Sequence, residues 1–203
     1  MKKKLLKIFL VSIPIIVIAL IVFFRLTAEP SNEEIIMGLR NIKNYTTKVD
    51  YLIVNSRGEE MEETIHYFSK DFGSRIDFGE ERIKIYKDDR ILIKDNISNK
   101  EYEIDKEMDR FHSIAFIDKL LENPIIDGEI KEGQEEWGER EYIEFTSELF
   151  LDNEHLDKIR IFIDKNEEIP IGAVIYDTDG NDKVRIIYKE FKKLKEQEVS
   201  LFN

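Results

Sequence analysis

The residues best suited to acid–base or metal chemistry in this sequence are its three histidines, His66, His112 and His155. No two of them form the His-x-x-x-His pair that places two metal ligands on one helix face. His66 lies in a strand pattern, His112 in a first helical turn and His155 in an acidic loop. A structural or surface role is therefore the favoured interpretation of each histidine, and the sequence predicts no metal site.

The segment from Asp177 to Asp182 resembles a calcium-binding loop at first sight. In an EF-hand loop the sixth residue is glycine and the twelfth is an acid. Here Gly180 stands fourth and Tyr188 stands twelfth. A hairpin turn at Asp179-Gly180 is therefore the better interpretation of this segment.

Nucleophile and nucleotide-binding motifs are missing from the sequence. It contains no Gly-x-Ser-x-Gly, Walker or dinucleotide-binding pattern. It also has no cysteine, which excludes thiol nucleophiles, disulfides, thiolate metal sites and a lipidated cysteine. Its 43 carboxylates bring acid pairs together by chance, so such pairs are no evidence of glycosidase chemistry. We expect no catalytic residue, no metal ion and no cofactor, and a protein that is not an enzyme.

The charges of the chain are distributed unevenly. Residues 1–27 hold five of the 31 basic residues and no acid, so residues 28–203 carry 26 basic and 43 acidic side chains, a net charge of −17. A body this acidic repels phosphate backbones and anionic lipid headgroups alike, which excludes nucleic acid as a partner. The length of 203 residues is that of one ordinary domain.

The N-terminal segment predicts a membrane anchor. The uncharged run that starts at Ile8 and ends at Phe24 would span roughly 26 Å as a helix, close to the thickness of a bilayer core. Four lysines precede it: Lys2, Lys3, Lys4 and Lys7. Only Arg25 follows, so the N-terminus should be cytoplasmic. Cleavage after Ala28 as a secretory signal is the alternative, but Leu26 stands where a small residue belongs.

We therefore expect residues 1–27 to form a cytoplasmic tip and an uncleaved single-pass signal anchor. Residues 28–203 should form an extracytoplasmic domain, held at the cell membrane or in the envelope of a spore. The sequence does not distinguish these two locations.

The pattern of the domain begins with a helix and continues with strands. Ser31 and Glu34 form a capping box for a helix that should end near Asn44. Residues 111–121 predict a second helix, which Pro124 stops. Period-two patterns predict about ten strands, within 46–55, 62–70, 75–78, 82–87, 90–94, 101–104, 125–131, 141–147, 158–164, 171–177 and 183–191. We predict an α+β fold in which one curved antiparallel sheet, a half-barrel, wraps around the helices.

The second helical segment is apolar enough to lie in the hollow of such a sheet. We expect Phe116 and Leu120 to line this apolar hollow and to face three residues on the strands: Ile85, Ile93 and Ile175. Trp137 lies in the acidic stretch 133–140 and has two interpretations of equal weight. It is either an exposed anchor for a protein partner or a ring that packs against the sheet.

Several short stretches carry a resemblance to known proteins: residues 39–45 (LRNIKNY), 55–59 (NSRGE), 79–89 (GEERIKIYKDD), 200–202 (SLF) and the closing pattern within 169–192. With the order of the elements, they make the chain similar to the lipoprotein-carrier (LolA-like) superfamily. Within it, the chain resembles the germination lipoproteins of clostridial spore-formers (the GerS family) over roughly residues 33–203.

This resemblance implies a curved sheet around a helix, without catalytic or metal-binding residues. It also implies a role in spore germination, through binding and supporting a peptidoglycan amidase of the cortex. The chain departs from the family in one respect, because a lipoprotein needs a cysteine after its signal and this chain has none. The predicted N-terminal helix would then serve as the anchor.

Three functions are open from the sequence. The first is a membrane-tethered interaction protein that binds an envelope enzyme. The second is a lipid or lipoprotein carrier or receptor that uses the apolar hollow, although a helix fixed in one membrane cannot travel between two. The third is a hydrolase with an unrecognised acidic site. A lipid or a protein that co-purifies would separate the first two, and a homo-oligomer is compatible with all three.

Overall fold

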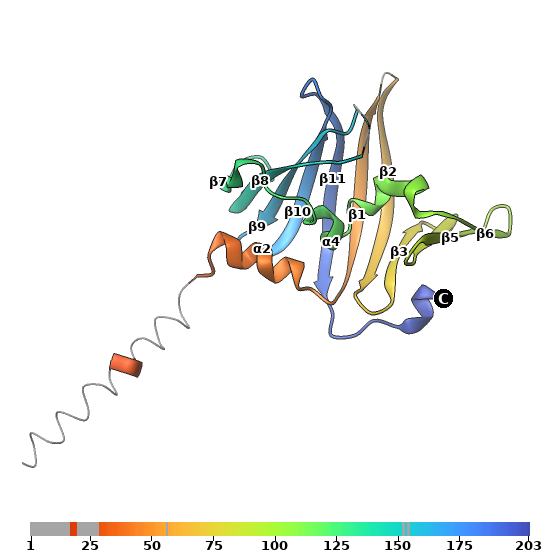
Figure 1. Cartoon of the computed structure of the whole chain (residues 1–203), viewed down its shortest axis with the longest axis horizontal. Coiled ribbons are helices and arrows are strands. Elements are labelled where there is room, and N and C mark those ends of the chain that lie inside the picture. The colour runs from red at the N-terminus through yellow and green to blue at the C-terminus, as the bar shows by residue number, and fades with distance from the viewer. Residues whose placement is uncertain (1–16, 20–28, 56, 152, 154) are drawn as a thin grey trace, which may run out of the picture.

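The structure is a computed structural model that describes residues 17–19, 29–55, 57–151, 153 and 155–203. Apart from residues 17–19, the expected anchor and its lysines lie outside the described residues. In the described part of the chain, no helix is both long and apolar enough to cross a bilayer. From residue 29 onward the chain forms one curved sheet with short helices against it (Figure 1).

Eleven antiparallel strands form this sheet, in the order β6-β5-β4-β3-β2-β1-β11-β10-β9-β8-β7. They are β1 (Asn44–Asn55), β2 (Gly58–Ser69), β3 (Gly73–Phe78), β4 (Arg82–Tyr86), β5 (Arg90–Asp95), β6 (Lys100–Asp105), β7 (Lys131–Gly133), β8 (Tyr142–Glu148), β9 (Lys158–Asp164), β10 (Ile169–Tyr176) and β11 (Asp182–Lys193). Two meanders, β1–β6 and β7–β11, meet where β1 pairs with β11. The predicted antiparallel sheet is confirmed.

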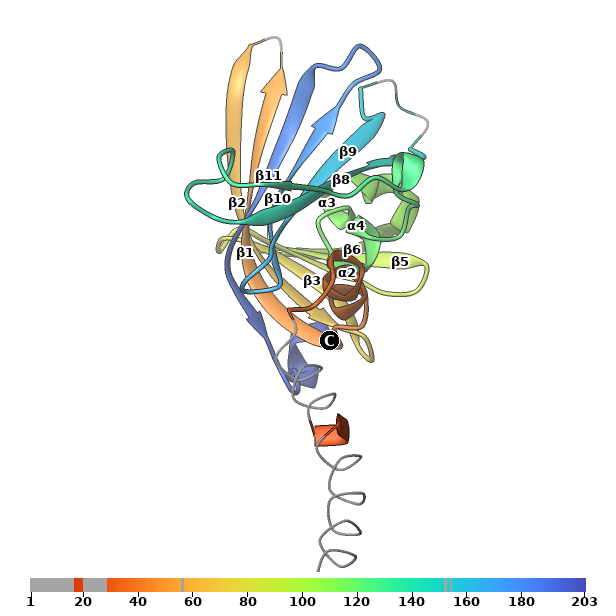
Figure 2. The same ribbon diagram turned by 90° about the vertical axis from the view of Figure 1, so that its left-hand side faces the viewer.

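The sheet bends around the helices, as Figure 2 shows. A twisted sheet of this many strands curls rather than staying flat. Register shifts between Thr46 and Lys48 in β1, and between Pro170 and Gly172 in β10, add local bends. The concave face therefore encloses the helices, and side chains from every second strand position point at them.

The first helix of the domain, α2 (Asn32–Arg40), begins as its sequence predicts. The Ser31 hydroxyl accepts from the Glu34 amide at 3.3 Å, and the Glu34 carboxylate accepts from the Ser31 amide at 2.9 Å. Ile35, Ile36 and Leu39 are buried against the sheet. The helix ends at Arg40 rather than near Asn44, because Asn44 is already the first residue of β1.

The predicted helix over residues 111–121 is wrong as a single element. The structure has a 3₁₀ turn η1 (Lys106–Asp109), α3 (Arg110–Ser113) and α4 (Ile117–Leu120), with Phe116 extended at φ −73° and ψ 137°. Two tyrosines of the sheet stabilise the break. The Tyr188 hydroxyl donates to the Ala115 carbonyl at 2.8 Å, and the Tyr45 hydroxyl accepts from the Ile117 amide at 2.9 Å. The break places Phe116 in the core, where 2% of it is exposed.

Of two further predictions from the sequence, a strand at residues 125–131 and a hairpin turn at Asp179-Gly180, the structure confirms only the second. Residues 125–131 form a 3₁₀ turn, η2 (Ile126–Gly128), followed by the short strand β7, so most of the predicted strand is wrong. The hairpin turn after β10 is confirmed. The Asp177 carboxylate accepts from the amides of Asp179 and Asn181 at 3.0 and 2.8 Å, which closes the turn.

A small second core lies on the convex face of the sheet. The ring of Trp137 packs 5.2 Å from that of Phe162 and directly over Gly172, where an added Cβ would lie 2.2 Å from the indole. Glu136, its neighbour, accepts from the Arg160 guanidinium at 2.7 Å, which fixes the loop on the strands. Of the two interpretations of Trp137, the structure shows the packed one.

Candidate functional site

The concave face is filled by side chains rather than open. Phe116 and Leu120 are each 2% exposed and belong to one buried cluster with Ile93 and Ile175. The ring of Phe116 lies 4.8 Å from His66 and 5.6 Å from Tyr86. The centre of the hollow is therefore packed core.

Ile85 lies on the opposite face of the sheet from the one expected. It pairs in register with Arg75, whose guanidinium donates to the Leu201 carbonyl at 3.1 Å, so the C-terminal residues cover this part of the convex face. The period of a strand is two, and β4 therefore turns Lys84 and Tyr86 inward instead. The sequence suggested the reverse because isoleucine is apolar and lysine is charged.

The inward side chains of β4 reach a polar cluster beneath α3. Lys84 Nζ donates to Asp109 Oδ2 at 2.6 Å, and the Tyr86 hydroxyl donates to the same oxygen at 2.8 Å. His112 Nδ1 lies 2.7 Å from Asp109 Oδ1, and His112 Nε2 lies 2.9 Å from Glu62 Oε2. The side chains of Lys84 and Asp109 are both 9% exposed. We call Glu62, Lys84, Tyr86, Asp109 and His112 the polar cluster.

Charge pairing within the polar cluster shifts the pKa of its members. Burial opposes the charged form of His112, but hydrogen bonds to Asp109 and Glu62 outweigh it and raise the pKa of the imidazole. Burial also opposes ionisation of Asp109, yet His112 and Lys84 hold the pKa of this carboxyl well below its usual range. The hydrogen bond from His112 lowers the pKa of Glu62. The imidazolium thus lies between two carboxylates.

The polar cluster connects the 106–113 segment to β2 and β4. Both oxygens of Asp109 and both ring nitrogens of His112 are already hydrogen-bonded within it. In the described ranges, no group of three His, Asp or Glu side chains could hold a metal ion. The arrangement can therefore fix the 106–113 segment on the sheet.

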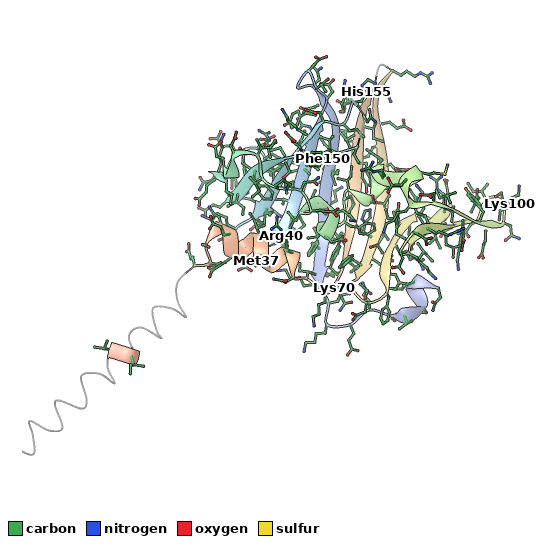
Figure 3. The ribbon with its side chains drawn as sticks, viewed as in Figure 1. Met37, Arg40, Lys70, Lys100, Phe150 and His155 are labelled. Atoms are coloured by element: carbon green, nitrogen blue, oxygen red, sulfur yellow. The ribbon has the colours of Figure 1, made fainter. Side chains whose placement is uncertain are left out.

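His66 lies beside the polar cluster and behaves in the opposite way to His112. It is fully buried, its Nε2 lies 3.3 Å from the Tyr51 hydroxyl, and burial lowers its pKa to about 3. His155, by contrast, is exposed in the β8–β9 connection (Figure 3).

The two buried histidines predict a stability maximum near neutral pH. Below pH 6.5 the unfolded state protonates His66 and the folded state does not, so the contribution of His66 to stability should fall by about 2 kcal/mol between pH 7 and pH 5. The stabilisation from His112 is fully present below its unfolded pKa and is lost as the pH rises through its raised folded pKa. Denaturant unfolding of the full chain in mild detergent, followed by the fluorescence of Trp137, measures the free energy of unfolding on the acid and the alkaline side of this maximum.

His66→Gln is the variant that isolates the acid side of this profile. The amide keeps a hydrogen-bonding group for Tyr51 but cannot be protonated, so the loss between pH 7 and pH 5 should disappear. An unchanged pH profile in this variant would contradict the assignment.

A cleft of about 680 Å³ opens beside the filled hollow, at the end of the sheet where β1 begins. Its floor is apolar and includes Tyr45, Phe68 and Phe116. Its rim is largely basic: Arg40, Lys70, Lys87, Lys106 and Lys119, with Asp71, Asp88 and Asp118 among them.

One long edge of the sheet is open to solvent. Strand β6 pairs only with β5, and five of its six residues are exposed. Its register with β5 places Glu101, Glu103 and Asp105 on one face, and Tyr102 and Ile104 on the other. On the acidic face, Glu101 and Glu103 already form exposed ion pairs with Lys94 and Arg90 of β5, at 3.8 and 3.3 Å. The strand therefore offers a partner this acidic face, an apolar face and an unpaired backbone.

Comparison with known proteins identifies the family. Residues 2–202 match the family described as sporulation protein YdcC-like. The chain belongs to this family. No curated protein matches the sequence.

Comparison with solved structures gives matches at low sequence identity. An uncharacterized conserved protein from Thermus thermophilus is 12% identical with a TM-score of 0.56, and the match covers 85% of this chain and 94% of that one. A LolA superfamily protein from Nitrosomonas europaea is 11% identical with a TM-score of 0.41, over 86% and 98% of the two chains. The structure of the CwlD amidase in complex with the GerS lipoprotein from Clostridioides difficile matches at 16% identity with a TM-score of 0.41. This match covers 85% of this chain and 98% of that one. The first of these likenesses shows the fold alone.

Several features of the site could not be found in the sequence. The spacing of Asp109 and His112 places both on one helical turn, which was a usable signal. Their partners Glu62 and Lys84 come from β2 and β4, and only the folded sheet brings them together. The exposed edge β6 could not be singled out, because only the folded sheet shows which strand is left without a second neighbour.

Proposed function

We propose that this sporulation-family protein is a membrane-anchored, non-enzymatic interaction protein that binds and supports a peptidoglycan amidase of the spore cortex. The observation that carries the proposal is the exposed edge strand β6. Its backbone is open to strand addition, and its acidic face suits a basic or neutral partner. The net charge of −17 for residues 28–203 would steer such a partner and repel acidic ones.

Two further observations support this proposal. The polar cluster uses its own polar groups internally, which leaves it a structural role. Residues of the concave face that a carrier would leave open, Phe116 and Leu120, are buried. The partner class comes from the sequence resemblance given above, and the match to the GerS complex carries no weight at its TM-score of 0.41.

Removing the acidic face of β6 should weaken amidase binding. The side chains of Glu101 and Glu103 are 65% and 54% exposed, so losing their ion pairs with Lys94 and Arg90 in Glu101→Gln with Glu103→Gln should cost at most about 1 kcal/mol of stability each. We expect the affinity of the full chain for the amidase to fall about tenfold, since each rim charge contributes a few tenths to one kcal/mol. Titration of the purified full chain with the purified amidase in mild detergent measures this affinity.

The matched control changes two exposed glutamates on another strand. Glu59→Gln with Glu60→Gln alters the net charge equally but lies on β2, and it should leave affinity unchanged. Binding should also weaken with added salt, because the Debye length falls from about 10 Å at 0.1 M to about 3 Å at 1 M. Equal affinity for both double variants would exclude β6 as the contact.

A lipid carrier or receptor is the second candidate, and the cleft is the observation that favours it. Its volume of about 680 Å³ and its apolar floor next to Phe116 would accommodate part of an acyl chain. A stoichiometric lipid in protein purified under native conditions would support this function over the first.

A further inference from the structure

The end of the domain where α2 finishes and β1 begins carries a group of exposed cations. Six gather there: Arg40, Lys43, Lys70, Lys192, Lys193 and Lys195. The Lys70 amide donates to the Lys43 carbonyl at 2.8 Å, and Lys193 pairs in register with Tyr45, two residues after Lys43. None of the six forms a salt bridge with a described residue. We call this the basic end.

Exposed apolar side chains are interleaved with these cations. Met37, Phe72 and Leu194 are 58%, 41% and 36% exposed. Phe72 follows Lys70 by two residues, Leu194 lies between two of the lysines, and Met37 lies one turn before Arg40. Figure 3 shows Met37, Arg40 and Lys70 at the same lower end of the domain. Cations beside exposed apolar groups are typical of surfaces that rest at a membrane interface.

The basic end is an exception within an acidic domain. Residues 28–203 carry a net charge of −17, whereas only Asp71, Glu190, Glu196 and Glu198 lie within three residues of any of the six cations. Glu190 is itself paired with Lys48. A positive end on a negative body orients the domain in the field of an anionic surface. Each lysine or arginine near such a surface contributes to attraction, and the effect fades within a Debye length.

The expected anchor places the membrane close to this end. The apolar run stops at Phe24 and α2 begins at Asn32. The seven residues between them can span at most about 25 Å. Because α2 continues to Arg40, the tether keeps the basic end within reach of the bilayer surface.

We propose that the basic end rests on the anionic phospholipid surface of the membrane that holds the anchor. Met37, Phe72 and Leu194 lie at headgroup level, and the six cations lie over the phosphates. Strand β6 stays clear of the bilayer at the far side of the domain, where Figure 3 shows Lys100, its first residue. The proposal does not depend on the identity of the protein that binds β6.

Site-directed spin labels test this orientation in the full chain. The sequence has no cysteine, so a single Phe72→Cys variant carries one nitroxide at the basic end. Thr178→Cys lies in the exposed turn before β11. It labels the end of β11 opposite to Lys192 and Lys193, which belong to the basic end. Each is reconstituted in vesicles of phosphatidylcholine with or without phosphatidylglycerol, and collisions with a water-soluble nickel chelate are measured. With phosphatidylglycerol present, accessibility should fall several-fold at residue 72 and stay unchanged at residue 178.

Charge reversal separates electrostatic contact from simple proximity. Lys70→Glu, Lys193→Glu and Lys195→Glu together should restore the accessibility of the label at residue 72. Arg57→Glu, Lys100→Glu and Lys158→Glu change the net charge equally on exposed positions elsewhere and should not. Equal accessibility in the two lipid compositions, or equal effects of the two triple variants, would overturn the proposal. The proposal would also be overturned if the amidase, but not the vesicles, shielded the label at residue 72 from the nickel chelate. The basic end would then bind a protein.

Discussion

Phe116→Ala is expected to lower the free energy of unfolding by about 3–5 kcal/mol, since it removes a fully packed ring from the core. The ring is 2% exposed and touches the aromatic rings of His66, Phe68 and Tyr86, with centroids 4.8, 6.5 and 5.6 Å away. It also occupies the break between α3 and α4, so the surrounding strands cannot easily collapse into the space. Denaturant unfolding of the full chain in mild detergent measures the loss.

Phe150→Ala is the matched control for this prediction. Phe150 is 60% exposed, so its truncation should change stability by less than about 0.5 kcal/mol. A loss below about 1 kcal/mol for Phe116→Ala, together with altered lipid uptake, would contradict the packed hollow. It would favour the carrier function instead.

Asp109→Asn should destabilise the protein by a similar amount, about 3–5 kcal/mol, because it leaves a buried cation unpaired. The Lys84 ammonium would keep only an amide as its partner, and the imidazolium of His112 would lose one of its two carboxylates. The 3₁₀ turn η1 and α3 should detach from β4 first, since Asp109 is their main link to it. Hydrogen exchange of residues 106–113 would show this as faster local opening.

A surface ion pair provides the comparison for Asp109→Asn. Asp182 and Arg185 lie 2.8 Å apart with side chains 36% and 44% exposed, so Asp182→Asn should cost at most about 1 kcal/mol. If Asp109→Asn also costs no more than that, the polar cluster does not hold α3. The double variant Lys84→Met with Asp109→Asn should recover part of the loss, because it removes the uncompensated charge.

Elements with a strong local pattern could be predicted from the sequence. The strand predicted at 158–164 has the bounds of β9, and the capping box at Ser31 begins α2 as expected. Both depend on residues close together in the chain: isoleucines at alternate positions in one case, a serine and a glutamate three apart in the other. Such signals do not need the rest of the fold.

Elements that depend on distant partners could not be predicted in this way. The break at Phe116 is stabilised by Tyr45 and Tyr188, which lie 72 and 73 residues from their backbone partners. Lys84 points inward because Asp109 receives it, 25 residues later. The periodicity of β4 allows either face to be buried, and a charged residue is buried only where a distant carboxylate compensates it.

We expect the protein to act on a cortex amidase and not on peptidoglycan itself. The most direct test measures hydrolysis of amide bonds in purified cortex peptidoglycan by the amidase, the full chain and the two together. The full chain alone should give no hydrolysis, and its addition should raise the amidase rate to a plateau. The Glu101→Gln, Glu103→Gln variant should need a higher concentration to reach it. An amidase rate that stays unchanged at every concentration of the full chain would contradict the proposed function.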